Sequence, residues 1–369
     1  MSDLLDIFLV APPGLEPVLA DEAREAGFAG VSIVPGGVAL QGDWREVWRA
    51  NLTLRCAVRV LVRVAQFRAM HLAQLDKRAR KVAWSDVLRP DVPVKVEATC
   101  RASRIYHAGA AAQRVERAIA ETLGAPLSDE APVTVKVRID DDLCTLSVDS
   151  TGESLHKRGH KMFVGKAPMR ESLAAAFLRQ CGYQPGEPVL DPMCGSGTFV
   201  IEAAEMASGL LPGRSRAFAF EQLASFHGQA WRKLRRAEPV GSVEPMFYGS
   251  DRDSGAISGA TANAERAGVS DLCQFRQGAV SDLERPAGPP GLVIVNPPYG
   301  ARIGSRKPLF AAHDALGRRL MEAFSGWRVG IITSDAGLAK ATGLPFATEE
   351  APVPHGGLKV RLYRTDPLP

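Results

Sequence analysis

The sequence predicts an α/β protein in which a doubly wound, mostly parallel sheet follows a smaller α+β module. From residue 169 onward, strand-like apolar runs alternate with segments of helical length, which is typical of a parallel sheet with helical crossovers. The first 150 residues alternate shorter segments of both kinds, and a stretch rich in Gly, His and Lys over 151–168 separates the two patterns. With 369 residues, each part is long enough to bury a core of its own.

In the N-terminal part, apolar alternation predicts short strands, and Pro35-Gly36-Gly37 predicts a turn between two of them. Strands are predicted at 5–10, on both sides of that turn within 31–40, and at 58–64, 94–99, 133–138 and 143–149. Helices are predicted at 14–26, 44–51 and 110–123.

The C-terminal part repeats a longer strand–helix unit. Strands are predicted at 189–191, 247–251, 272–277, 292–296 and 329–333, with two short ones near 346 and at 358–363. Helices are predicted at 170–180, from the glycine-rich loop to 207, at 254–267 and at 309–324.

Composition narrows the class of protein. The chain is 46% hydrophobic and 23% charged, which is typical of a globular protein. Its six cysteines are scattered without a CxxC pair, so we expect reduced thiols and no metal site. No signal peptide and no stretch long enough to span a bilayer is recognisable, so we expect a cytoplasmic protein without a membrane partner.

Positive charge is concentrated in two places. Between Arg55 and Arg117 there are 14 Lys/Arg against 5 Asp/Glu, and residues 156–170 hold 5 Lys/Arg and no acid. This distribution indicates a nucleic-acid partner, although residues 77–81 alone could be a solvated helix face. Contacts to RNA are expected in the second stretch at His156, Lys157, Arg158 and Lys161.

A glycine-rich loop follows the predicted strand 189–191. A Walker loop would need Lys-Ser/Thr where Thr198-Phe199 stands, and a dinucleotide fingerprint would need a third glycine where Val200 stands. The remaining ligand class is a nucleoside without a pyrophosphate, such as S-adenosylmethionine. Cofactor contacts are expected from the whole loop, namely Asp191, Pro192, Met193, Cys194, Gly195, Ser196, Gly197 and Thr198.

Three side chains near this loop have alternative roles. Asp191 could bind the ammonium group of the cofactor. Asp251, at the end of the next strand, could bind the ribose hydroxyls, and the alternative for it is a helix N-cap. Cys194 is interpreted as a packing residue rather than a nucleophile, because it lies in the cofactor loop and not beside the acceptor.

The tetrapeptide Asn296-Pro297-Pro298-Tyr299 follows an apolar run that predicts a buried parallel strand. The Asn296 side chain and the Pro297 carbonyl can accept hydrogen bonds from a planar NH2 group, and Tyr299 can stack on the ring that carries it. These residues therefore indicate a site that presents an exocyclic amine of a nucleobase to an electrophile.

In this order the motifs closely resemble the THUMP-domain class I methyltransferases that modify guanine N2 in large-subunit ribosomal RNA. The resemblance covers the whole chain and is most specific at 155–159, 167–176, 190–198 and 296–300. It implies a ferredoxin-like domain at 1–55, a THUMP RNA-binding domain at 56–155, a linker at 156–168 and a catalytic domain at 169–369. It also implies a seven-strand Rossmann-like sheet and S-adenosylmethionine as the methyl donor.

One departure from the family pattern concerns the cofactor adenine. Many class I methyltransferases carry an Asp directly after the third strand, where this chain has Gly278-Ala279-Val280, so the nearest acid, Asp282, is the candidate. We expect methylation of guanine N2 in large-subunit ribosomal RNA or an assembly intermediate. A tRNA guanine-N2 methyltransferase, an adenine-N6 methyltransferase and a non-catalytic RNA-binding protein are the alternatives, and the sequence does not indicate the oligomeric state.

Overall fold

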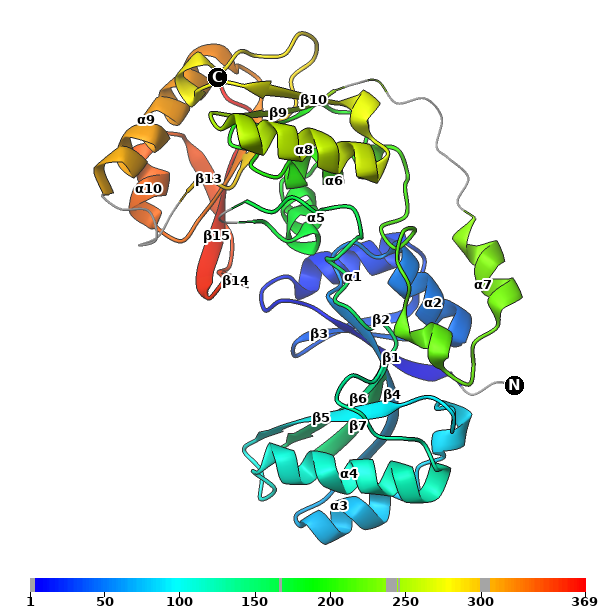
Figure 1. Cartoon of the computed structure of the whole chain (residues 1–369). Helices are drawn as coiled ribbons and strands as arrows, with labels where there is room; N and C mark the ends of the chain where they lie inside the picture. The colour runs from blue at the N-terminus through cyan, green and yellow to red at the C-terminus, as the bar shows by residue number, and fades with distance from the viewer. Residues whose placement is uncertain (1–3, 166–167, 237–243, 245, 299–305) are drawn as a thin grey trace. The chain divides into compact units, whose positions relative to one another are not determined.

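The computed structural model describes residues 4–165, 168–236, 244, 246–298 and 306–369 (Figure 1). Contacts between residues divide the chain into two compact units. Unit 1 consists of Met1–Ala11, Leu19–Leu155 and Arg216–Arg236, and unit 2 consists of Pro12–Val18, His156–Ser215 and Ala237–Pro369.

Within the described residues of unit 1, seven strands form one continuous sheet in the order β2-β3-β1-β4-β7-β6-β5. Neighbouring strands are antiparallel except β5 and β6. The central strand β4 pairs with β1 on one side and with β7 on the other. Strands β1 to β3 and strands β5 to β7 therefore belong to the same sheet. The strands are β1 (Leu5–Val10), β2 (Ala29–Val34), β3 (Gly37–Gly42), β4 (Arg59–Arg68), β5 (Val94–Arg101), β6 (Val133–Asp140) and β7 (Leu143–Asp149).

Of the helices described in this module, the longest buries a single apolar stripe. In α4 (Ala108–Leu123) the buried residues are Ala111, Val115, Ala118 and Ile119, the spacing of a single helical face. Figure 1 shows α4 beside α3 (Leu72–Ala79) under the same end of the sheet. The other helices here are α1 (Glu16–Glu25) and α2 (Trp44–Thr53).

Residues 216–236 lie in the sequence between two elements of unit 2, yet they pack in unit 1. The segment contains helix α7 (Gly228–Arg235). Trp48 of α2 stacks on Phe220 with ring centroids 5.9 Å apart, and Phe220 meets Trp231 of α7 edge-on at 4.9 Å. Burial of these three aromatic rings fixes the segment on the N-terminal module.

Unit 2 contains the predicted parallel sheet. In the part of the chain that is described, its seven main strands follow the order β10-β9-β8-β11-β12-β15-β13, and β14 pairs with β15. The five strands β8 to β12 are parallel to one another, whereas β15 is antiparallel to its neighbours. The bounds are β8 (Val189–Asp191), β9 (Phe247–Asp251), β10 (Cys273–Gln277), β11 (Leu292–Val295), β12 (Arg328–Thr333), β13 (Phe346–Glu349), β14 (Val353–His355) and β15 (Leu358–Thr365).

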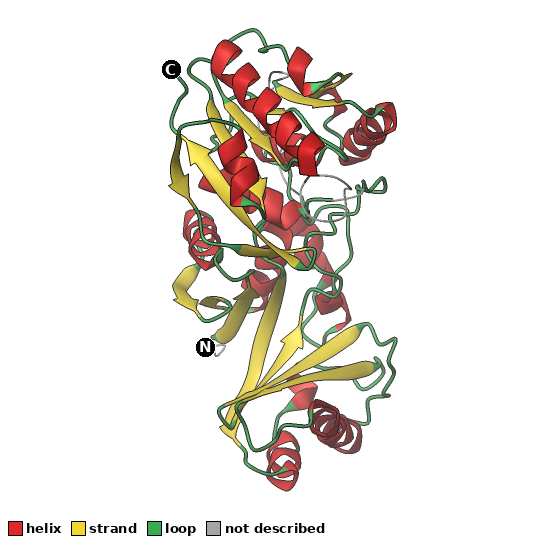
Figure 2. Ribbon diagram, turned by 90° about the vertical axis from the view of Figure 1, so that its left-hand side faces the viewer, coloured by secondary structure: helices red, strands yellow, loops and turns green. Residues whose placement is uncertain are grey.

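Helices cover both faces of this sheet, as Figure 2 shows. The whole of β11 is therefore buried, which explains its uninterrupted apolar sequence. Val293 and Val295 pack in one apolar core with Leu320 of α9 and with Phe324, which directly follows that helix. The helices are α5 (Glu171–Gln180), α6 (Thr198–Ala207), α8 (Ser254–Ala267), α9 (Arg306–Ala323) and α10 (Ala336–Ala341).

The predicted α/β class and the predicted strands and helices are confirmed, with ends that shift by a few residues. Four elements carry too weak a pattern to be predicted, namely α3, α7, α10 and β14. Helix α3 buries only Leu75 and Ala79, and helix α7 buries only Trp231. Both helices lie in basic segments of the sequence. The other two have six and three residues, too few for periodicity to show.

Candidate functional site

The candidate site lies where the parallel strands of unit 2 end. Strand β8 occupies the centre, the chain moves outward to β9 and β10 on one side, and β11 then pairs on the other side of β8. The strand order therefore reverses between β8 and β11, the position where open α/β sheets bind ligands. Asp191 ends β8, Asp251 ends β9 and Asn296 follows β11, so the predicted residues share this edge.

Asp251 holds the glycine-rich loop in place. Its Oδ2 atom accepts a hydrogen bond from the backbone N–H of Gly195 at 3.0 Å, and its Oδ1 atom accepts one from the N–H of Asp253 at 3.0 Å. The helix cap of α8 is Asp253, which accepts from the N–H groups of Gly255 at 2.8 Å and Ala256 at 3.3 Å. Because each carboxylate oxygen has two lone pairs, the half-buried Asp251 can still accept hydrogen bonds from a ligand.

The glycines of the loop are needed for two different reasons. Gly195 and Gly197 have φ angles of +50° and +78°, a backbone conformation that favours glycine. A Cβ atom on Gly197 would lie 3.1 Å from the ring of Phe275, whereas one on Gly195 would meet nothing within 4 Å. The space in front of Gly195 is therefore open, as a ligand that approaches the backbone requires.

Asp191 is a buried acid, with 2% of its surface exposed. Burial, together with the charge of Asp251, raises the pKa of Asp191 to about 8, against a lowering contribution from the N–H of Met193, which donates to its Oδ1 at 3.0 Å. A cation placed beside this carboxyl would favour its ionised form. The position thus suits the ammonium group of an amino acid moiety.

Cys194 is buried, and its backbone N–H donates to the carbonyl of Ser250 at 2.9 Å. Burial, with the nearby charges of Asp191 and Asp251, raises the pKa of the Cys194 thiol well above its usual value. A nucleophilic cysteine needs a lowered pKa, so these surroundings favour the packing role.

The acceptor residues continue directly from β11. Asn296 is partly buried, with its Oδ1 atom inside the protein, Pro297 is buried and Pro298 is half-buried. Val293 of β11 pairs with Leu190 of β8, so Asn296 extends from the strand next to the glycine-rich loop. Tyr299 lies outside the described residues.

The candidate for the cofactor adenine is in an exposed turn. Asp282 ends the short 3-10 helix Val280–Asp282 and accepts a hydrogen bond from the Ser281 hydroxyl at 3.1 Å. The N–H of Gly278 donates to the carbonyl of Asp251 at 3.0 Å, so this turn starts beside the end of β9. A contact from Asp282 to adenine stays a prediction.

Asn263 of α8 joins the linker to the glycine-rich loop, a role that was not predicted from the sequence. Its Nδ2 atom donates to the carbonyls of Ser196 at 3.1 Å and Phe163 at 3.0 Å, and its Oδ1 accepts from the N–H groups of Met162 and Phe163, both at 3.2 Å. The available signal is a single polar side chain among the buried residues of the helix, which are Ala256, Gly259, Ala260, Asn263, Ala264 and Ala267.

The placement of Lys161 differs from the prediction of an RNA contact. Its Nζ atom lies 3.1 Å from the Glu171 carboxylate and donates to the carbonyl of Met169 at 2.7 Å and to the Thr198 hydroxyl at 3.3 Å. An ammonium group with these partners stabilises the end of the glycine-rich loop instead of facing a phosphate.

Arg158 also requires a correction, whereas an RNA contact from the half-buried His156 stays a prediction. The Arg158 side chain is 2% exposed and lies 3.3 Å from the carboxylate of Glu202, which is equally buried, so it cannot reach RNA. Burial, and then the charges of Arg170 and other nearby cations, lower the pKa of His156 to about 4, which leaves the imidazole neutral at pH 7. Among the four predicted contacts, Lys157 is the exposed one.

Two further properties concern the described residues as a whole. They contain no group of three or more His, Cys, Asp or Glu side chains arranged to hold a metal ion. Within the same residues, no helix has the length and apolar character needed to cross a membrane.

Comparison with protein families covers most of the chain. Residues 158–364 match the family described as the RMKL-like methyltransferase domain. Residues 6–61 match the RlmL ferredoxin-like domain, and residues 69–149 match the THUMP domain.

Two individual relatives align with more than nine-tenths of the chain. The chain is 32% identical over 368 residues to slr0064 of Synechocystis sp., a candidate RNA methyltransferase, and covers 95% of that protein. It is 35% identical over 364 residues to the ribosomal RNA large subunit methyltransferase K/L of Chromohalobacter salexigens, of which it spans only half the length. These alignments include 97% and 93% of the present chain, respectively.

Among solved structures, SMU.472, a candidate methyltransferase in complex with SAH, superposes with a TM-score of 0.88 and 26% identity, with all of both chains covered. The open space at Gly195, the buried carboxyl of Asp191 and the half-buried carboxylate of Asp251 fit the methionine and ribose portions of S-adenosylmethionine. The chain therefore belongs to the RMKL-like methyltransferases, which are dependent on S-adenosylmethionine, and it carries an N-terminal THUMP domain.

Proposed function

We propose that this protein transfers a methyl group from S-adenosylmethionine to the exocyclic N2 amine of a guanine in RNA, and that the RNA is large-subunit ribosomal RNA or its assembly intermediate. The observation that carries the proposal is the position of Asn296, which extends from β11 at the point where the strand order reverses beside the loop of β8. The THUMP domain and the name of the relative from C. salexigens support RNA as the substrate class.

The cofactor supplies an electrophilic methyl group, and the protein has to align the acceptor with it. In the proposed reaction, Asn296 and the Pro297 carbonyl accept hydrogen bonds from the amine, which directs the nitrogen lone pair toward the methyl group. Alignment of this kind contributes up to roughly 7–11 kcal/mol in favourable systems. Tyr299 stacks on the base, and the amine proton leaves after transfer, so no strong general base is needed.

The remaining assignments belong to the same proposal. Asp191 binds the ammonium group, Asp251 binds the ribose and Asp282 contacts the adenine. His156 and Lys157 contribute to RNA binding, whereas the buried Arg158 and the half-buried Lys161 are positioning residues that pair with Glu202 and Glu171.

The test is mass spectrometry of nucleosides from separated ribosomal RNA and tRNA of a deletion strain and its parent. Loss of N2-methylguanosine from large-subunit ribosomal RNA alone is the expected result. Loss from tRNA would move the substrate to that RNA, and loss of N6-methyladenosine would overturn the base assignment. An unchanged set of methylated nucleosides would contradict the proposed activity.

A further inference from the structure

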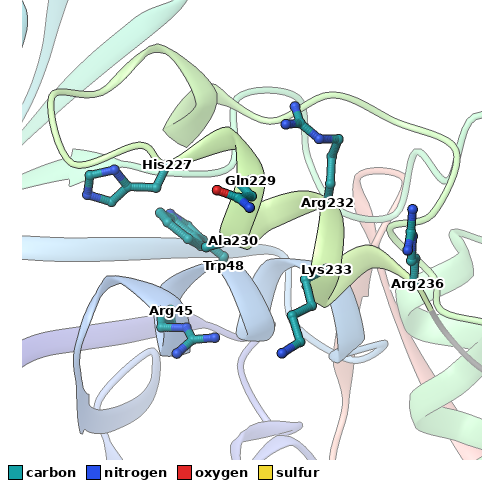
Figure 3. Close-up of a pocket in the computed structure, with 8 residues that line it drawn as sticks. All are labelled: Arg45, Trp48, His227, Gln229, Ala230, Arg232, Lys233 and Arg236. Carbon is teal, nitrogen blue, oxygen red and sulfur yellow. The ribbon is translucent and has the colours of Figure 1, made fainter.

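A groove of about 770 Å³ lies in unit 1, away from the strand ends that form the candidate active site. Figure 3 shows that two of its residues come from α2 and the others from the segment that contains α7. Its lining consists of Arg45, Trp48, His227, Gln229, Ala230, Arg232, Lys233 and Arg236.

The lining is strongly cationic. Arg45, Arg232, Lys233 and Arg236 are exposed, and among the residues that the structure describes none of them forms an ion pair with a carboxylate. Among the described residues, those that line the groove include no acid. Elsewhere in unit 1 exposed cations are commonly neutralised, as in the pair of Arg24 with Asp21 at 2.7 Å. Four like charges held together without neutralisation indicate an anionic ligand.

The wall of the groove is held by aromatic packing. Trp48 is 1% exposed and lies against Phe220 and Phe226, with ring centroids 5.9 and 5.8 Å apart. The guanidinium of Arg235 lies over the Trp231 ring, 5.7 Å from its centroid, and donates to the carbonyl of Arg216 at 3.1 Å. This packing fixes one turn of α7 and leaves Arg232 and Lys233 directed to solvent. A rigid support lowers the entropy lost when a ligand binds.

We propose that this groove binds the phosphodiester backbone of the RNA substrate and is an RNA-binding surface in addition to the THUMP domain. The inference rests on the proposed function, because it takes the ligand to be RNA. The cations come from α2, from α7 and from Arg236 directly after α7, and they line a groove much larger than one phosphate ion, which suits several phosphates of a chain rather than a single small anion. The groove is formed by α2 and by residues 216–236, which in the sequence interrupt the catalytic part. RNA in the groove would therefore contact α2 and this inserted segment at the same time.

The test measures RNA binding by the full-length protein as a function of salt. Arg232→Gln/Lys233→Gln removes two groove cations at exposed positions, and Arg232→Lys/Lys233→Arg keeps both charges. The matched control Arg24→Gln/Arg318→Gln removes two exposed cations outside the groove, each paired with an acid on its own helix. Thermal unfolding and S-adenosylhomocysteine affinity check that all three variants fold.

The neutralised variant should bind a large-subunit ribosomal RNA fragment roughly 5–30-fold more weakly near 0.15 M salt, with a slope of log K against log salt reduced by about 0.7–0.9 per cation. The charge-retaining variant and the control should behave like the parent. An unchanged affinity and slope for the neutralised variant would overturn the groove proposal while the methyltransferase assignment stands. Inorganic phosphate binding is measured in the same proteins. If the neutralised variant loses phosphate binding but keeps RNA binding, the groove is a site for a small anion and the RNA proposal is overturned. Absence of RNA binding by the parent itself would reject the proposed function first.

Discussion

The backbone N–H of Gly195 donates a hydrogen bond at 3.0 Å to the carboxylate of Asp251, although the two residues are 56 positions apart. The end of β9 thereby fixes the loop that follows β8, because the Cys194 N–H also donates to the carbonyl of Ser250 in the same strand. One acid is therefore expected both to shape the cofactor loop and to contact the cofactor.

Replacement of Asp251 tests this double role. Asp251→Ala should weaken S-adenosylhomocysteine binding roughly 10–100-fold, because a hydrogen bond to a charged group contributes about 1.5–3 kcal/mol. Isothermal titration calorimetry measures the loss. The matched control is Asp253→Ala, which removes the cap of α8 and should lower the free energy of unfolding by about 1 kcal/mol with little change in cofactor affinity. Equal affinities for the parent and Asp251→Ala would remove Asp251 from the cofactor site.

The raised pKa of Asp191 predicts proton release when the cofactor binds. With a pKa of about 8 the carboxyl is mostly protonated at pH 7, and an ammonium group beside it favours ionisation. Calorimetry in two buffers of different ionisation enthalpy should detect release of up to one proton at pH 7, vanishing above about pH 9. The Asp191→Asn variant should bind without this release. The same proton count in both proteins would place the ammonium elsewhere.

The same pKa shift makes a prediction about stability. Because the folded-state pKa of Asp191 lies above the ordinary value of 3.8, the folded protein binds more protons than the unfolded chain between about pH 4 and 8. The stabilising contribution of Asp191 to the free energy of unfolding is thus fully present below about pH 4 and is lost as the pH rises toward 8. Urea unfolding of parent and Asp191→Asn across this range should show a smaller decline for the variant, and parallel curves would contradict the shift.

Asn296 is expected to act on the acceptor and not on the cofactor. Asn296→Ala should lower kcat about 100-fold or more, by analogy with the loss of one aligned polar group in other active sites, while S-adenosylhomocysteine affinity stays within about twofold. Single-turnover methylation assays measure the first quantity and calorimetry the second. Retained activity would exclude this side chain from the mechanism, and a joint loss of cofactor binding would indicate a structural role.

The pair of Arg158 and Glu202 should contribute to folding and not to RNA binding. Both side chains are 2% exposed, so Arg158→Met removes a cation that lies 3.3 Å from a buried carboxylate and should cost about 3–5 kcal/mol of unfolding free energy. Arg158→Met/Glu202→Met should recover much of that loss, and Lys157→Ala at the exposed neighbour should change stability by less than about 0.5 kcal/mol. A stable Arg158→Met protein with weakened RNA binding would restore the role predicted from the sequence.

Much of the catalytic fold is predictable because local signals agree with the final structure. The apolar run of β11, the glycines of the loop and the helix that ends at Gly268 each determine their element through backbone and burial requirements. The alternation of strands and helices predicts a mostly parallel, doubly wound sheet, whereas the order of its strands is known only from the structure. Because Asp191, Asp251 and Asn296 each end or follow a predicted parallel strand, the sequence alone predicts that they lie at one edge of the sheet.

The linker and the insertion at 216–236 are where prediction from the sequence fails, and the reason is long-range packing. A run of basic residues has the same local pattern on a surface and in a buried ion pair, so the partner Glu202 of Arg158 is not evident. No local pattern assigns the insertion to the N-terminal module, because the contact that holds it there, between Phe220 and Trp48, joins residues more than 170 positions apart in the sequence. The charge of the α2–α7 groove arises only after that packing.

The most direct test of the proposed activity is methylation by the purified protein. Large-subunit ribosomal RNA from the deletion strain is incubated with methyl-labelled S-adenosylmethionine and either the parent protein or Asn296→Ala, and the digested nucleosides are identified by mass spectrometry. We predict labelled N2-methylguanosine with the parent protein and none with the variant. Label in another nucleoside, or equal N2-methylguanosine from both proteins, would contradict the proposal that Asn296 presents the guanine amine for methylation.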